Sequence, residues 1–140
     1  MNSSAPYLLD THVWLWLMNG DALLKKKTLD LIQKASLRGL LRVSAISVWE
    51  VAMLESRGRI TLSMTCMDWV TQSLNAPGIS LLPLTPEISV DSTRLPGQFH
   101  GDPADQILVA TARKYGAVLL TRDQGILQYG DQEYVKTMEI

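Results

Sequence analysis

Four acidic residues stand where buried segments end or helices begin. Asp10 directly follows the apolar segment 7–9, and Asp123 comes shortly after a later apolar run. Glu50 and Asp105 each fall in the first turn of an expected helix. Carboxylate oxygens are the preferred ligands of hard divalent cations such as Mg²⁺ and Mn²⁺. Brought together, these four side chains could hold such an ion and support hydrolysis of a phosphate ester.

Each acid taken alone also has a structural explanation. Acids suit the positive amino end of a helix and accept hydrogen bonds from its free N–H groups. Asp10 could simply cap a helix, and Glu50 could close a capping box that Ser47 opens. Four carboxylates held together repel one another unless a cation neutralises them, so a convergent set would be costly as architecture alone. The residue types by themselves leave open whether the four converge.

Short apolar runs alternate with helical segments along the chain. Strands are expected at 7–9, 40–43, 79–84 and 117–121. Helices are expected at 22–36, 47–57, 68–74, from Thr85 onward and from Asp102 to Gly116. A parallel neighbour is reached only through a long, usually helical crossover, so this order predicts an α/β fold with a mainly parallel central sheet. The carboxyl ends of such strands share one edge with the amino ends of helices, where ligands bind.

Size and composition predict one small domain, spanning residues 1–140, in the cytoplasm. The chain has 140 residues, of which 46% are hydrophobic, enough for one continuous core. Cys66 is its only cysteine, which excludes an internal disulfide and a cysteine-based zinc cluster and suits a reducing compartment. No positive charge precedes the first apolar residues, and no apolar run approaches the ~18 to 20 residues that span a bilayer. We therefore expect no membrane contact.

The formal net charge of −1 provides no general attraction to nucleic acid. Proteins that bind mainly through phosphates usually have a marked basic excess, so any such contact must be local. The densest basic run is the three lysines 25–27, and a run of this kind on a helix more often keeps a surface soluble than binds a ligand. Arg57, Arg59 and Arg122 could hold phosphates that flank a reaction site.

Three segments of the chain carry a family resemblance. In chain order they read YLLDTHVWLW, VSAISVWEVAMLESRGRI and HGDPADQILVATARKYGAVLLTRD, and together they span most of the sequence. They resemble the signature blocks of the PIN-domain family, particularly its VapC toxins. The resemblance implies a three-layer α/β/α domain with ribonuclease activity that depends on Mg²⁺ or Mn²⁺. It also implies an RNA substrate, a homodimer and an antitoxin protein as partner.

The resemblance assigns the site residue by residue. By position, the catalytic and metal-binding acids are Asp10, Glu50, Asp105 and Asp123. The family places its third acid seven residues before the second alanine of a run such as 109–112, which reads Val-Ala-Thr-Ala here. This spacing selects Asp105 and leaves Asp102 as a helix cap or an outer helper.

Four further polar residues near the acids could have either a functional or a purely structural role. Thr11 and Thr121 are candidates for orienting carboxylates, although threonine beside a strand end is also ordinary β-sheet chemistry. His12 and His100 could touch a phosphate or relay a proton. Neither has a paired ligand at a metal-binding spacing, so surface or loop roles are expected for both.

Three other kinds of protein place acids on a parallel sheet. A phosphatase of the haloacid dehalogenase kind, another metal-dependent phosphohydrolase, has a second aspartate two residues after the first, and His12 stands there in this chain. A phosphoacceptor receiver domain needs an adjacent acidic pair early in the chain and a lysine after a late strand, and neither is present. A catalytically silent binding module with the same fold is the third alternative, and the intact set of four acids argues against it.

The segment 13–18 would be apolar around its whole circumference if it were helical. A surface helix shows one apolar stripe, and a small domain has limited interior for a segment of this kind. It is therefore either core or part of an interface, and Met53, Met64, Met67 and Trp69 add apolar surface in later helices. With the family resemblance, we expect an interface for a second copy or for an antitoxin.

Overall fold

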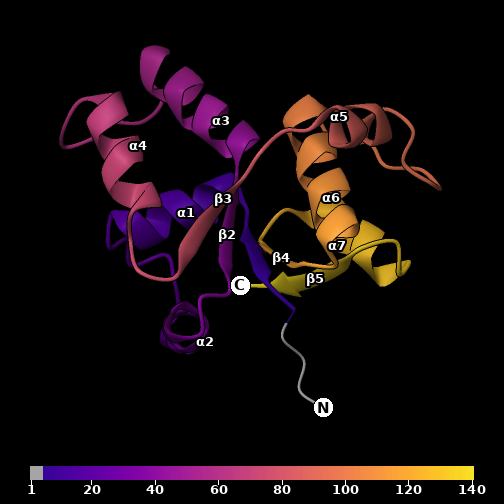
Figure 1. Cartoon of the computed structure of the whole chain (residues 1–140), viewed down its shortest axis with the longest axis horizontal. Coiled ribbons are helices and arrows are strands. Elements are labelled where there is room, and N and C mark those ends of the chain that lie inside the picture. Colours follow the sequence, from indigo (N-terminus) through magenta and orange to yellow (C-terminus); the bar gives the residue numbers. More distant parts are fainter. Residues whose placement is uncertain (1–4) are drawn as a thin grey trace.

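The computed structural model describes residues 5–140, which form a five-stranded sheet flanked by helices (Figure 1). The strands are β1 (Tyr7–Leu9), β2 (Leu41–Ser44), β3 (Ile79–Leu82), β4 (Val118–Thr121) and β5 (Lys136–Glu139). The helices are α1 (Thr11–Met18), α2 (Lys26–Leu37), α3 (Ala45–Ser56), α4 (Cys66–Leu74), α5 (Pro86–Ser92), α6 (Pro103–Tyr115) and α7 (Gln124–Asp131). The strand order is β3-β2-β1-β4-β5, and every neighbouring pair is parallel. The predicted parallel sheet is therefore confirmed.

Two hydrophobic clusters cover the two faces of the sheet. Leu9 belongs to one cluster, with buried side chains from α1, α2, α3 and α4. Its neighbour Leu8 belongs to the other, with buried side chains from α6 and α7. Successive side chains of a strand point to opposite faces, so one short strand contributes to both clusters. Figure 1 shows these helix groups on opposite sides of the sheet, which confirms the three-layer α/β/α arrangement.

The last two elements, α7 and β5, were not predicted from the sequence. β5 reads Lys-Thr-Met-Glu and is mostly exposed, so it lacks the apolar pattern that indicates a strand. It pairs with β4 at one edge of the sheet, from Val118 opposite Lys136 to Thr121 opposite Glu139. Its conformation is stabilised by this pairing with β4, and a non-local pairing leaves no local signal.

The start of α3 differs from the predicted capping box. Ser44, the last residue of β2, is the N-cap and accepts a hydrogen bond from the Ile46 amide at 3.1 Å. Ser47 lies inside the helix and is completely buried. The Glu50 carboxylate accepts a hydrogen bond from the Thr11 hydroxyl, which lies on α1. The capping-box explanation of Ser47 and Glu50 is therefore wrong, because the strand passes directly into the helix without a loop.

The apolar segment 13–18 lies in the core of the chain as part of α1. Val13, Trp14 and Leu15 are buried, and the next three residues pack against the same cluster. The Trp14 ring meets the buried Trp69 ring edge-on, with centroids 4.8 Å apart. The core interpretation is therefore correct for Val13, Trp14 and Leu15, and only the partly exposed residues 16–18 of this segment are accessible to a partner. Exposed apolar side chains on the later helices α3 and α4 are Trp49, with 55% of its surface exposed, and Met67, with 67%.

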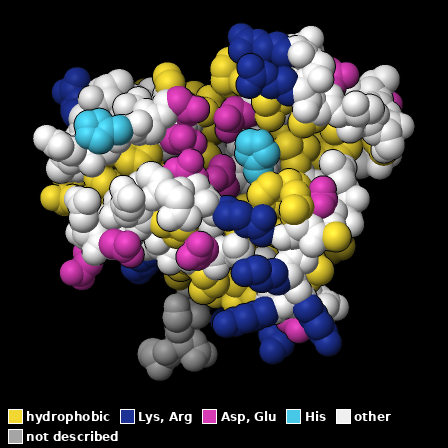
Figure 2. Space-filling view, turned by 180° about the vertical axis from the view of Figure 1, so that it is seen from behind, with side chains coloured by type: hydrophobic (Ala, Val, Ile, Leu, Met, Phe, Trp, Pro, Cys, Tyr) yellow, Lys and Arg dark blue, Asp and Glu magenta, His cyan; other side chains and the backbone are white. Residues whose placement is uncertain are grey.

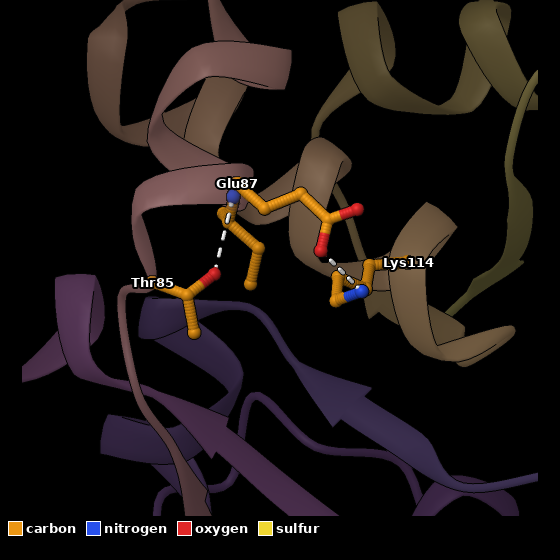
Figure 3. A network of polar contacts seen from close by, with 4 residues as sticks. Thr85, Glu87 and Lys114 are labelled. Atoms are coloured by element: carbon orange, nitrogen blue, oxygen red, sulfur yellow. Dashed lines mark hydrogen bonds and ion pairs between the residues drawn. The ribbon is translucent and has the colours of Figure 1, made fainter.

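The helices α5 and α6 pack against each other on the second face of the sheet. Thr85 caps α5 by accepting a hydrogen bond from the Ile88 amide at 3.1 Å, and Glu87 forms an ion pair with Lys114 of α6 (Figure 3). Such an exposed pair contributes little to stability, so this packing depends mainly on buried side chains. As predicted, Gly116 ends α6, with a φ of 61°. None of the helices within residues 5–140 has both the length and the apolar character to cross a membrane.

Candidate functional site

The four acids selected from the sequence line one pocket at the carboxyl edge of the sheet. Asp10 follows β1 and Asp123 lies two residues after β4, and these strands are neighbours. Glu50 comes from the second turn of α3 and Asp105 from the first turn of α6. The pocket has a volume of about 420 Å³ and is lined by Asp10, His12, Val13, Trp16, Glu50, Asp102, Asp105, Arg122 and Asp123. Figure 2 shows acidic side chains gathered near the middle of one face.

The sheet topology explains why the pocket forms there. The chain passes from β1 to β2 on one side, whereas β4 pairs with the other side of β1. The connections therefore leave this point in opposite directions, the position at which open parallel sheets bind ligands. Asp10, Asp102 and Asp123 are the N-cap residues of α1, α6 and α7. The capping explanation and the convergence of the acids are both correct, since capping places these carboxylates at helix ends that face the pocket.

The Thr121 hydroxyl connects Asp10 with Asp123. It donates a hydrogen bond to Asp10 Oδ2 at 2.7 Å and accepts one from the Asp123 amide at 3.0 Å. Thr121 is completely buried, so this hydroxyl cannot exchange its partners for water. The other oxygen of Asp10 accepts a hydrogen bond from the Thr11 amide at 2.7 Å. These contacts fix the orientation of the Asp10 carboxylate.

A second buried network orients Glu50. The Thr11 hydroxyl donates to Glu50 Oε1 at 2.5 Å and lies 2.8 Å from the Ser47 hydroxyl. A hydroxyl has one hydrogen, so Ser47 must donate to Thr11 when Thr11 donates to Glu50. The sequence-based interpretation missed this role of Ser47, because its spacing to Glu50 matches a capping box.

Burial and mutual repulsion raise the pKa values of three pocket acids. Burial raises the pKa of Asp10, although hydrogen bonds from Thr121 and Thr11 act in the opposite direction. Burial likewise raises the pKa of Glu50. For Asp105, burial and then the negative charges of the other pocket acids raise the pKa to about 7. The pocket therefore favours an added positive charge, whether a proton or a cation.

The residues of the pocket fit a divalent cation in chemistry and charge. The one ion pair formed within residues 5–140 joins Lys114 and Glu87, so no described lysine or arginine pairs with a pocket carboxylate. Carboxylate oxygens are hard donors of the kind that Mg²⁺ and Mn²⁺ prefer. In the described part of the chain, no three acidic, histidine or cysteine side chains are already arranged around one ion position. The fit therefore concerns the donor types and the charge of the pocket and not a formed set of ligands.

The remaining candidates lie at or beside the pocket. His12 and Arg122 line it, as does Asp102, which also accepts a hydrogen bond from the Asp105 amide at 2.8 Å. His100 lines an adjoining pocket that shares Asp102, Asp105 and Asp123. Arg57 and Arg59, at and beyond the end of α3, do not line either pocket. Trp16, in the pocket wall, was not singled out from the sequence because it lies within a continuous apolar run.

Comparisons with known proteins agree with this fold. The sequence matches the PIN domain family model over residues 7–132. It is 34% identical over 117 residues to ribonuclease VapC22 of Mycobacterium tuberculosis, covering 84% of this chain and 86% of that protein.

Similar structures have been solved for proteins of two other organisms. VapBC2 of Rickettsia felis, bound to a DNA fragment from its promoter, has a chain that matches with a TM-score of 0.68 at 12% identity, covering 95% of this chain and 97% of that one. FitAcB of Neisseria gonorrhoeae matches with a TM-score of 0.64 at 19% identity, covering 94% and 96%. At these identities the structural likeness concerns the fold.

The fold and the pocket define an α/β/α domain with a carboxylate-lined site at the carboxyl edge of a parallel sheet. The chain belongs to the PIN-domain family, because the family model matches residues 7–132 and a relative is 34% identical. The family prediction made from the sequence is thereby confirmed.

Proposed function

We propose that the protein is a metal-dependent endoribonuclease and the toxin of a toxin-antitoxin pair. The observation that carries this proposal is the meeting of four carboxylates in one pocket, none of which forms an ion pair with a lysine or arginine of the described residues. The ribonuclease named among its relatives supports RNA as the substrate. In this proposal Asp10, Glu50, Asp105 and Asp123 are the catalytic and metal-binding residues, and Mg²⁺ or Mn²⁺ is the ion.

We propose a separate role for each of the four acids. Asp10 and Asp105 would hold the ion, which when bound would supply Lewis acidity and lower the pKa of the attacking water. Glu50 has one oxygen engaged by Thr11, so its other oxygen is available to orient that water. Asp123 holds a second or more loosely bound ion. The water gives up a proton as its oxygen forms a bond to phosphorus. One bond from phosphorus to a ribose oxygen breaks, and that oxygen takes up a proton, which leaves a phosphate monoester on one fragment and a hydroxyl on the other.

Cleavage of a mixed RNA pool tests this function directly. We expect the purified protein to cut RNA in the presence of Mg²⁺ or Mn²⁺. Cleavage should stop when EDTA is added and resume when the ion is restored. Sequencing the 5′ ends of RNA fragments after brief expression would identify the RNA that is cut. A protein that leaves the pool intact with either ion would favour a catalytically silent binding module.

Replacing Thr121 with valine is expected to lower cleavage about 10- to 100-fold, the usual effect of losing a group that orients a metal ligand. Valine keeps the shape of the threonine side chain but removes its hydroxyl. That hydroxyl donates a hydrogen bond to Asp10 and accepts one from the Asp123 amide. The measurement is kcat/KM at saturating Mg²⁺, together with the Mg²⁺ concentration for half-maximal activity.

Thr111→Val is the matched control for this variant. Thr111 is equally buried, but its hydroxyl donates to the Ile107 carbonyl within α6 and does not line the pocket. Both variants should lose some stability, since each loses a buried hydrogen bond. Equal activity loss in the two variants would show that Thr121 acts through stability alone.

We also infer that the chain pairs with a second copy and binds an antitoxin in the cytoplasm. A solved toxin-antitoxin complex from Klebsiella pneumoniae contains a chain of similar fold, with a TM-score of 0.56, and supports this partner. The exposed Trp49, which precedes Glu50 on α3, is a suitable contact for a partner. Trp14 and Trp69 are buried, so a change in tryptophan fluorescence on antitoxin binding should come mainly from Trp49 or Trp16.

Light scattering is expected to give the mass of a dimer at micromolar concentration, and native expression should yield a co-purifying small partner. The Trp49→Phe variant should reduce the fluorescence change when that partner is added back. A monomer with no co-purifying partner would contradict this assignment.

A further inference from the structure

A groove rich in lysine lies close to the acidic pocket. It has a volume of about 860 Å³ and is lined by Lys25, Lys26, Lys27, Thr28, Asp30, Leu31, Lys34, Met138, Glu139 and Ile140. All four lysines are exposed, and they outnumber the acidic groups of the groove, Asp30 and Glu139, even when a carboxylate at Ile140 is counted. Figure 2 shows basic side chains extending from beside the acidic group toward one edge of the molecule. The groove is thus locally positive on a chain whose net charge is −1.

Arg122 connects the acidic pocket to this groove. Its side chain lines the acidic pocket, and its Nε donates to the main-chain oxygen of Ile140, which lines the groove, at 3.2 Å. A second guanidinium nitrogen donates at 2.6 Å to the carbonyl of Leu23, two residues before Lys25. The guanidinium also lies 4.7 Å from the centre of the Trp16 ring. These contacts fix a positive charge at the point where the pocket and the groove meet.

The position of the lysines is not explained by the stability of α2. Lys25 is the N-cap residue and makes no side-chain capping bond, and Lys26 and Lys27 begin the helix. Positive charges at this end oppose the helix dipole, which favours anions there. Three adjacent lysines also repel one another. An anion bound in the groove would remove both costs, because it would neutralise the lysines and meet the free N–H groups of the first turn.

We infer that this groove binds the phosphate backbone of the RNA strand whose reactive phosphodiester lies in the acidic pocket. The choice of RNA rests on the proposed function. Acidic side chains repel a polyanion, so a strand entering the pocket needs positive charge beside it, and Arg122 with the four lysines provides it. Contacts to phosphates position a strand without reading its sequence, so the groove contributes affinity and direction rather than sequence specificity.

The test compares two triple variants that lose the same charge. Lys25→Gln/Lys26→Gln/Lys27→Gln removes three lysines of the groove. The control, Arg38→Gln/Arg94→Gln/Lys136→Gln, removes three exposed positive charges outside both the pocket and the groove. Both are made in an Asp10→Asn background and measured in EDTA, so that binding is observed without cleavage. The probe is a fluorescein-labelled single-stranded RNA of ~16 nucleotides, the upper end of common single-strand site sizes.

The groove variant is expected to bind the probe at least about tenfold more weakly at low salt, and the control to stay within about twofold. The slope of log affinity against log salt should become shallower by about 2 in the groove variant, since each phosphate contact on a single strand contributes about 0.7. Circular dichroism should show both variants folded, because removing lysines from the start of α2 relieves repulsion. Equal affinities and equal slopes in the two variants would overturn the inference.

Cleavage assays with the intact pocket separate this inference from the proposed function. The groove variant should raise KM for the ~16-nucleotide RNA while kcat stays unchanged, and an RNA of ~4 nucleotides should be cut as by the parent. A parent that binds RNA with the expected salt dependence but cuts none would refute the proposed function and leave the groove assignment standing. A groove variant with the parental KM for the longer RNA would refute the groove assignment alone.

Discussion

Replacing Asp10 or Asp105 with asparagine is expected to lower RNA cleavage about a thousandfold or more, equivalent to roughly 4 kcal/mol of transition-state stabilisation. Each change removes a negative charge from the pocket and a strong metal ligand, and either loss weakens the stabilisation of charge on the phosphodiester. The fold should be retained, because asparagine is as good an N-cap as aspartate at position 10. Single-turnover cleavage rates and circular dichroism measure the two effects.

Asp68→Asn is a suitable control for these variants. Asp68 is exposed in the first turn of α4 and does not line the acidic pocket. The same chemical change there should leave cleavage within about twofold of the parent, as expected for a surface substitution. Full activity in Asp10→Asn or in Asp105→Asn would remove that residue from the site.

The metal-free protein is expected to lose stability as the pH rises toward and through about 7. The pKa of Asp105 is about 7 in the folded chain, against 3.8 as its ordinary value, so the folded state binds this proton more tightly than the unfolded state. The contribution of Asp105 to stability is fully present below its pKa in the unfolded chain. It is lost as the pH rises through its pKa in the folded chain. Melting temperatures in EDTA between about pH 5 and pH 8.5 should fall in the parent and change less in Asp105→Asn.

Added Mg²⁺ should reverse this loss in the parent at pH 8. An ion at about 100 times its Kd stabilises the folded state by about 2.7 kcal/mol, which corresponds to a rise in Tm of about 10 °C. In Asp105→Asn the metal-free protein should be as stable as the parent or more so, because repulsion is relieved, and the ion should raise its Tm less. Equal Mg²⁺-induced shifts in both proteins would show that Asp105 is not part of an ion site.

Much of the fold could be predicted from the sequence, because the signals are local. Buried strands such as β1 and β4 are short apolar runs, and α6 begins at Asp102-Pro103 and ends at Gly116, residues whose backbone preferences suit those positions. The order of these elements requires helical crossovers, and crossovers require a parallel sheet. The sequence therefore also determined that each of the four acids lies near the carboxyl edge.

Other features depend on contacts between distant residues and have no local signal. β5 is a polar edge strand stabilised by pairing with β4. Ser47 and Glu50 have the spacing of a capping box, but Ser44 caps the helix and Thr11 bonds both side chains across 36 and 39 residues. The spacing of Ser47 and Glu50 therefore indicated a cap that does not form. A spacing between two side chains does not show at which residue the helix begins, and here the N-cap lies three residues before Ser47, the expected N-cap.

The sequence by itself determined the residue types of the site: four acids, two threonines and a basic run. Only the tertiary structure decided which of them meet. Thr121 and Asp10 are hydrogen-bonded although they lie 111 positions apart along the chain. Thr121 ends β4 and Asp10 follows β1, and the pairing of these neighbouring strands brings the carboxylates of Asp10 and Asp123 to one pocket. The same holds for Arg122, whose bond to Leu23 spans 99 positions and joins the pocket to the lysines of α2. Charge repulsion and phosphate attraction act over a few ångströms, so the chemistry of these residues depends on distances that only the folded chain defines.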